Sequence, residues 1–144
     1  MKALSSKVAG IASSATLDIA DRAKAMVREG IDVISLSIGE PDFDTPSHIR
    51  DACCESLRRG DTHYAPSRGI PELLQAIAGQ IQAENHFPCS PEQIIATAGA
   101  KHAIAMAMEA CLNPGDEVIL LDPAWVSYEP CVQLAGGRVV HHRL

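Results

Sequence analysis

The second half of the chain contains a short run of residues that suits the binding of an anion. Gly99, Ala100 and Lys101 lie between a predicted strand and a predicted helix. Small side chains leave the first N–H groups of a helix accessible, and those groups together with the helix dipole favour a phosphate. Trp125 follows the next predicted strand and can lie over a ring attached to that phosphate. The arrangement indicates a site for a phosphate-bearing aromatic ligand.

Each of these residues also has a simpler interpretation. The glycine at position 99 is equally consistent with a plain turn from strand to helix, and Lys101 can simply face solvent. Trp125 comes just after the carboxyl end of a strand, where open α/β sheets bind ligands, but packing in the core fits its local sequence as well. The chain has neither the glycine pattern of dinucleotide-binding folds nor that of P-loop enzymes, which argues against a nucleotide site.

Two loops in the first half carry further candidate residues. Residues 39–46 (Gly-Glu-Pro-Asp-Phe-Asp-Thr-Pro) contain two prolines, which fix φ, and Gly39, which can adopt dihedrals that other residues avoid. A simple connector seldom needs this combination, so we interpret the loop as functional. In the second loop, at residues 63–69, Tyr64 either anchors the loop or donates its hydroxyl to an anion.

The spacing of apolar residues predicts helices and strands in alternation, and hence an α/β fold. Thr16 and Ser47 are predicted helix N-caps, and Pro71 suits the first turn of a helix. Two strands joined by a helix predict a parallel sheet, which a further helix and strand extend. The predicted strands are residues 32–37, 94–97, 117–121 and 138–142, and the predicted helices are 16–30, 47–59, 71–85, 100–112 and 126–134.

Composition argues against several classes of partner. The net charge of −6 gives no attraction to nucleic acid or to an anionic membrane. No apolar run approaches the roughly 20 residues that a membrane helix needs, and the first ten residues lack a signal-peptide core. His141 and His142 fit a strand better than a metal site. Scattered cysteines without a C-x-x-C motif favour a reduced, cytoplasmic protein: Cys53, Cys54, Cys89, Cys111 and Cys131.

Taken together, these segments resemble the class I aminotransferases of the aspartate aminotransferase type in their bacterial branch, which use pyridoxal 5'-phosphate. The resemblance runs from about residue 4 to the end of the chain, and it depends on the order and spacing of six short motifs. The motifs are 14–16 (Ser-Ala-Thr), 39–46, 64–71 (Tyr-Ala-Pro-Ser-Arg-Gly-Ile-Pro), 99–101 (Gly-Ala-Lys), 114–117 (Pro-Gly-Asp-Glu) and 125–128 (Trp-Val-Ser-Tyr).

The resemblance implies aminotransferase fold type I. Residues 1–46 would form an arm, a helix and a substrate loop that belong partly to the small domain. Residues 47–144 would form an incomplete large domain with a parallel sheet, which binds pyridoxal phosphate. The family works as a homodimer, so the resemblance also implies a second copy of the chain as partner.

The resemblance further assigns roles to single residues. The backbone of Gly39 would lie against the α-carboxylate of the substrate. Residues 99–101 would surround the cofactor phosphate, and Trp125 would stack on the pyridine ring beside the substrate. Tyr64 would reach the phosphate of the cofactor in the partner subunit. Many relatives have an aromatic residue where Ala124 stands, so the pocket beside Trp125 is expected to be wider here.

The catalytic centre implied by the family is incomplete in these 144 residues. Its chemistry needs a lysine that forms a Schiff base with the cofactor, an acid at the pyridine nitrogen and an arginine for the substrate carboxylate. In the family all three come later than the region matched here, and none of the four lysines corresponds to the catalytic one: Lys2, Lys7, Lys24 and Lys101. We therefore expect no catalytic residue in the chain and no transamination by the chain alone.

Three functional hypotheses follow from the sequence. The first is the N-terminal part of an aminotransferase that acts on an amino acid such as aspartate and on a 2-oxo acid. The second is a non-catalytic remnant or split subunit that binds a partner chain. The third, a small nucleotide-binding α/β domain, lacks the expected glycine patterns. Because a parallel sheet with an uncovered face exposes apolar surface, we also expect poor solubility or dependence on a partner.

Overall fold

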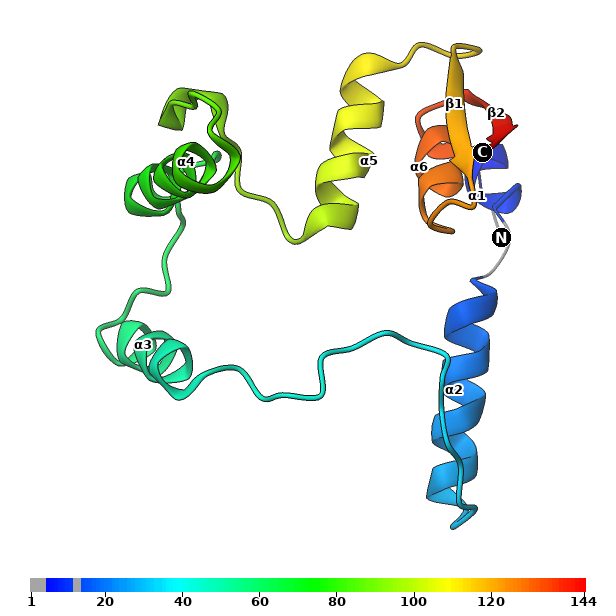
Figure 1. The fold of residues 1–144 in the computed structure, drawn as a ribbon, viewed down its shortest axis with the longest axis horizontal. Helices are drawn as coiled ribbons and strands as arrows, with labels where there is room; N and C mark the ends of the chain where they lie inside the picture. Colours follow the sequence, from blue (N-terminus) through cyan, green and yellow to red (C-terminus); the bar gives the residue numbers. More distant parts are fainter. Residues whose placement is uncertain (1–4, 12–13) are drawn as a thin grey trace. The chain divides into compact units, whose positions relative to one another are not determined.

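The computed structural model describes residues 5–11 and 14–144 (Figure 1). The chain divides into two compact units. Unit 1 comprises Met1–Asp42 and Ile104–Leu144, and unit 2 comprises Phe43–Ala103. The predicted domain boundary after residue 46 stays a prediction. The elements are α1 (Ser6–Ala9), α2 (Ala15–Arg28), α3 (Ser47–Arg58), α4 (Pro71–Asn85), the 3₁₀ turn η1 (Pro91–Gln93), α5 (Ala100–Cys111), β1 (Glu117–Asp122), α6 (Tyr128–Leu134) and β2 (Arg138–Arg143).

Unit 1 contains a parallel pair of strands joined by a helix. Strands β1 and β2 pair from Glu117 opposite Arg138 to Asp122 opposite Arg143, and α6 forms the crossover between them (Figure 1). The side chain of Val132 on α6 is fully buried. This confirms the predicted parallel arrangement of the last two strands, although α6 begins two residues later than expected.

The amino-terminal end of this sheet is closely packed and joined by backbone hydrogen bonds. The N–H of Gly115 donates to the carbonyl of Gly136, and the N–H of Arg138 donates to the carbonyl of Asp116. A Cβ at Gly137 would lie only 2.9 Å from a methyl group of Val132 and 3.0 Å from one of Leu112. Glycine is therefore required where the chain enters β2, because any side chain there would collide with the core.

Helix α2 and the extended segment that follows it form a separate part of unit 1. Ser14 occupies the N-cap position, so the prediction of Thr16 as the cap is wrong by two residues. The predicted strand at 32–37 is also wrong: these residues have no strand assignment and pair with no strand among the described residues. Ile34 and Leu36 are 88% and 93% exposed. Alternating residues favour an extended backbone, but a strand also needs a neighbour.

Unit 2 is built around α4, which has the predicted limits and begins with Pro71. Pro71 fits the first position because its missing N–H would have no acceptor inside the helix. Leu74 and Ala78 of α4 form a small core with Ile94, and three partly buried residues pack against it: Ile77, Cys89 and Ala96. This core holds α4 against the chain that leads to α5.

Two further sequence predictions for unit 2 are corrected by the structure. Helix α3 begins at Ser47 itself and Pro46 takes the N-cap position, so Ser47 is not the cap. Residues 94–97 form no strand, and the strand–helix–strand unit predicted from them is absent from the described residues. The N–H of Ala96 instead donates to the carbonyl of Arg68, 2.8 Å away, in an isolated backbone hydrogen bond.

Two glycines of unit 2 provide a matched test of these contacts. Gly69 has a φ of +116°, and a Cβ there would lie 3.0 Å from the Cβ of Ala96. Gly79 lies inside α4, and a Cβ there would meet nothing within 4 Å. We expect Gly69→Ala to lower the free energy of unfolding by about 2 kcal/mol, from backbone strain and overpacking. We expect Gly79→Ala to raise it by roughly 0.5–1 kcal/mol.

Urea unfolding of the two purified variants beside the parent protein measures both effects. Equal shifts of the two variants in the same direction would contradict the close approach of Gly69 to Ala96.

Candidate functional site

The turn before α5 brings the three candidate phosphate-binding residues together. Gly99 has a φ of +89°, its N–H donates to the carbonyl of Thr97 at 2.8 Å, and the Thr97 hydroxyl donates to the carbonyl of Gly99 at 3.1 Å. The Gly99 carbonyl then accepts from the N–H of Ala103, which is the first bond of the helix. The amides of residues 100–102 precede that bond and lie at the exposed end of α5.

The chemistry of this helix end fits a phosphate group. Its first turn contains the side chain of Lys101 and no acidic residue. A Cβ built on Gly99 would meet nothing within 4 Å, so the space beside the backbone is open. Backbone N–H groups, a nearby ammonium group and the positive end of a 12-residue helix all favour an anion. The residues present therefore suit the phosphate of pyridoxal phosphate.

Trp125 lies in the loop between β1 and α6, just past the carboxyl end of β1. Its ring meets the ring of Tyr128 edge to face, with centroids 5.4 Å apart and planes at 90°. The N–H of Tyr128 also donates to the carbonyl of Trp125, which forms the turn into α6. Since 43% of Trp125 is exposed, it is not a buried core residue, and Tyr128 supports it from one side.

Gly39 and Tyr64 lie on exposed loops. Gly39 is not among the glycines with positive φ, so it does not use the dihedrals that other residues avoid. A Cβ at Gly39 would meet nothing within 4 Å, which leaves its backbone accessible to a ligand. The side chain of Tyr64 is fully exposed, and Phe43 in the 39–46 loop is 86% exposed.

The candidate residues divide between the two units. Residues 99–101 form one turn in unit 2, where Tyr64 lies on a different loop, and Gly39 and Trp125 belong to unit 1. Sequence reasoning missed Tyr128 as the support of Trp125 and Arg68 as a hydrogen-bonding residue of unit 2. The three-residue spacing from Trp125 to Tyr128 at the start of a predicted helix was an available signal for the first.

A second group of ionisable residues lies where β1 ends. The Nδ1 of His141 is 3.0 Å from a carboxylate oxygen of Asp122, and its Nε2 is 3.9 Å from a carboxylate oxygen of Glu129. Across residues 5–11 and 14–144, no group of three or more histidine, cysteine, aspartate or glutamate side chains is arranged to hold a metal ion. Nor does any helix in that part of the chain have the length and apolarity to cross a membrane.

The sequence and the fold match a known family of enzymes. Residues 31–144 match the family described as aminotransferase class I and II, and the chain belongs to that family. This confirms the resemblance to the aspartate aminotransferase type. The predicted α/β aminotransferase fold is confirmed by solved structures as well.

Individual relatives cover the whole chain. It is 46% identical over 140 residues to the aspartate/prephenate aminotransferase of Thermus thermophilus, a match that spans 97% of this chain and 36% of the relative. It is 44% identical over 138 residues to the aspartate aminotransferase of Bacillus subtilis, with 96% and 35% covered. The structure of the Thermus thermophilus aspartate aminotransferase with maleate superposes with a TM-score of 0.96 at 45% identity, over 99% of this chain and 37% of that one. The chain thus spans little more than a third of the length of these relatives.

Proposed function

We propose that this chain is part of an aminotransferase that uses pyridoxal phosphate to transfer an amino group between an aspartate-like amino acid and a 2-oxo acid. The observation that carries the proposal is the turn before α5, where a left-handed Gly99, exposed helix amides and Lys101 provide donors for a phosphate. Family membership supports the reaction class. When bound, pyridoxal phosphate accepts the electron pair released when a proton leaves the α-carbon of the amino acid.

The residues of the turn and of the β1–α6 loop would hold the cofactor. Ala100 and Lys101 would donate their backbone N–H groups to its phosphate, and the ammonium group of Lys101 would add positive charge. Trp125 would lie against the pyridine ring and border the substrate, with its own ring kept in place by Tyr128. A rigid aromatic wall of this kind restricts the orientation of the ring and excludes water from one of its faces.

The two exposed loops would complete the site. The accessible backbone of Gly39 would lie against the α-carboxylate of the substrate. The hydroxyl of Tyr64 would donate to the phosphate of the cofactor held by the partner subunit of a homodimer, for which its full exposure leaves it available. The cytoplasmic location, for which the scattered cysteines argue, belongs to the same proposal.

An acidic substrate is the best-supported choice. The relatives in Thermus thermophilus and Bacillus subtilis are named as aspartate/prephenate and aspartate aminotransferases. The Thermus thermophilus enzyme was solved with maleate, which like aspartate is a four-carbon dicarboxylate. Ala124, beside Trp125, has a smaller side chain than the aromatic residue that many relatives have at this position. It would therefore leave room for a substrate larger than aspartate as well.

The phosphate role of Gly99 can be separated from its conformational role by a matched pair of variants. Gly99 and Gly115 have φ values of +89° and +92°, and a Cβ at either meets nothing within 4 Å. Alanine at each position should therefore cost a similar free energy of folding, about 1–2 kcal/mol. Only Gly99→Ala places a methyl group beside the helix-end amides, so it alone should weaken pyridoxal phosphate binding, by roughly tenfold.

Fluorescence titration of both variants with pyridoxal phosphate, and with pyridoxal as the ligand without phosphate, measures this effect. Equal affinity of the two variants for pyridoxal phosphate would refute the role of the turn.

The reaction itself is tested with the purified full-length protein, aspartate and 2-oxoglutarate, by measuring the glutamate formed. We expect turnover that depends on added pyridoxal phosphate. Residues 1–144 expressed alone should form no glutamate, because none of their lysines matches the catalytic lysine of the family. Turnover by that segment alone would contradict this assignment. Turnover that appears only after a complementary chain is added would favour the split-subunit alternative.

A further inference from the structure

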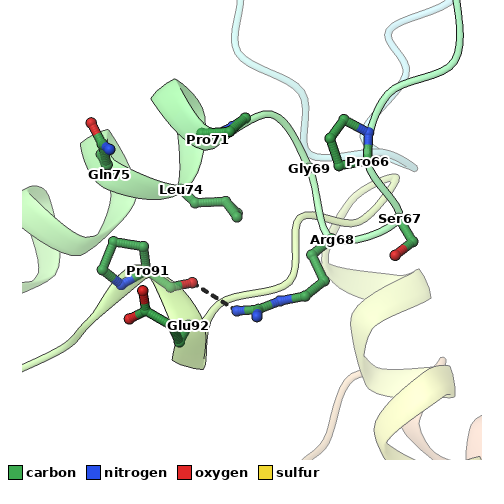
Figure 2. Close-up of a pocket in the computed structure, with 9 residues that line it drawn as sticks. All are labelled: Pro66, Ser67, Arg68, Gly69, Pro71, Leu74, Gln75, Pro91 and Glu92. Carbon is green, nitrogen blue, oxygen red and sulfur yellow. Dashed lines mark hydrogen bonds between the residues drawn. The ribbon is translucent and has the colours of Figure 1, made fainter.

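Arg68 connects one loop of unit 2, through hydrogen bonds, to the segment that leads into the Gly99 turn before α5. Its guanidinium lines a pocket of about 340 Å³ between the 66–71 loop, α4 and η1 (Figure 2). One terminal nitrogen donates to the carbonyl of Pro91 at 2.8 Å and to that of Ile94 at 3.0 Å, and Nε donates to the Ile94 carbonyl at 3.2 Å. The dashed line in Figure 2 marks the bond to Pro91.

The backbone of Arg68 holds the same segment a second time. Its carbonyl accepts from the N–H of Ala96 at 2.8 Å. Ile94 is buried, and a buried carbonyl needs a hydrogen-bond donor. Residues 94–97 have no strand beside them among the described residues. The hydrogen bonds that a neighbouring strand would supply come instead from the side chain and the carbonyl of Arg68.

The neighbouring residue allows this close contact. Gly69 approaches Ala96 so closely that a Cβ would lie 3.0 Å from the Cβ of Ala96. The negative charge of Glu92 borders the same pocket. A hydrogen bond from the Ser90 side chain, and more weakly the charge of Arg68, lowers the pKa of Glu92, so this carboxylate stays ionised beside the guanidinium. Arg68 is therefore partly buried, and it bonds this segment through both its guanidinium and its backbone carbonyl.

Arg68 lies between two candidate phosphate-binding residues. Tyr64 precedes it by four residues on the same loop, and Ala96 is followed by Thr97, whose carbonyl and hydroxyl shape the Gly99 turn. A series of hydrogen bonds within unit 2 thus connects Arg68, through Ala96 and Thr97, to Gly99. A shift of the 94–96 segment would move Thr97 and tilt the amides at the start of α5.

We propose that Arg68 is a positioning residue, which holds the Gly99 turn in fixed register with the loop that carries Tyr64 and thereby sets the affinity of that turn for the cofactor phosphate. This inference rests on the proposed function and extends it to a residue that touches neither substrate nor cofactor. A guanidinium is suited to the task because its planar donors reach two carbonyls at once. The single ammonium of a lysine presents no such fork.

The test uses the full-length protein with Arg68→Ala and Arg68→Lys. Arg59→Ala is the matched control, because Arg59 is exposed, pairs with Asp61 and carries the same charge. We expect Arg68→Ala to bind pyridoxal phosphate about tenfold more weakly while its affinity for pyridoxal stays unchanged. Arg68→Lys should bind with intermediate affinity, and added guanidinium ion should restore part of the phosphate-specific binding to Arg68→Ala.

A second measurement needs no cofactor. In the protein without pyridoxal phosphate, the amide of Ala96 should exchange its hydrogen about tenfold faster in Arg68→Ala than in the parent or in Arg59→Ala. If Arg68→Ala does not fold, Arg68→Lys provides the same two readouts with smaller expected changes. Phosphate-specific weakening together with faster Ala96 exchange supports the proposal.

Three results would overturn the inference. Equal loss of affinity for pyridoxal and pyridoxal phosphate would show a merely structural role. The Arg68 variants could keep the parent's affinity for pyridoxal phosphate and its rate of Ala96 amide exchange, while Gly99→Ala still binds the cofactor more weakly. That result would refute the role of Arg68 but not the proposed function. If the parent protein itself shows no phosphate-dependent binding, both the role of Arg68 and the proposed function are refuted. This outcome is recognised from the parent protein alone, before any variant is made.

Discussion

The amino terminus of α5 depends on the left-handed backbone of a single residue. Gly99, with a φ of +89°, turns an extended segment into a helix and is held by two hydrogen bonds with Thr97. Because the first helical bond comes only at Ala103, the amides between these residues remain at the surface, where the helix dipole favours an anion. The conformation that glycine permits at this position thus also exposes the amides to which we assign the phosphate.

Local chemistry made several elements predictable. The limits of α4 follow from Pro71, which suits a first turn, and from its apolar spacing. The parallel pair β1 and β2 follows from two alternating segments separated by a helix of suitable length. The aminotransferase family was predictable from six short motifs, because their order and spacing are jointly restrictive. For α4 and for the strand pair the information lies within about 30 consecutive residues, whereas the family motifs are spread over residues 14–128.

Other features depend on partners that a local pattern does not contain. The segments 32–37 and 94–97 have strand-like sequences, yet each lacks a neighbouring strand among the described residues. Thr16 and Ser47 are good capping residues, but the helices begin earlier, after Ser14 and at Ser47 itself. Arg68 was overlooked because its acceptors lie 23 and 26 residues further along the chain. The division of the site residues between two units likewise has no local signature.

The two ends of the β1–β2 sheet differ in how well they tolerate the replacement of a side chain. At the amino end a Cβ on Gly137 would collide with Val132 and Leu112, so almost any replacement disturbs the core. At the carboxyl end Ala124 is only half-buried and Trp125 is supported by Tyr128 rather than enclosed. Natural variation can therefore enlarge or reduce side chains at the carboxyl end without disturbing the sheet. Under the proposed function, a new substrate preference would arise there by a single replacement while the scaffold is inherited unchanged.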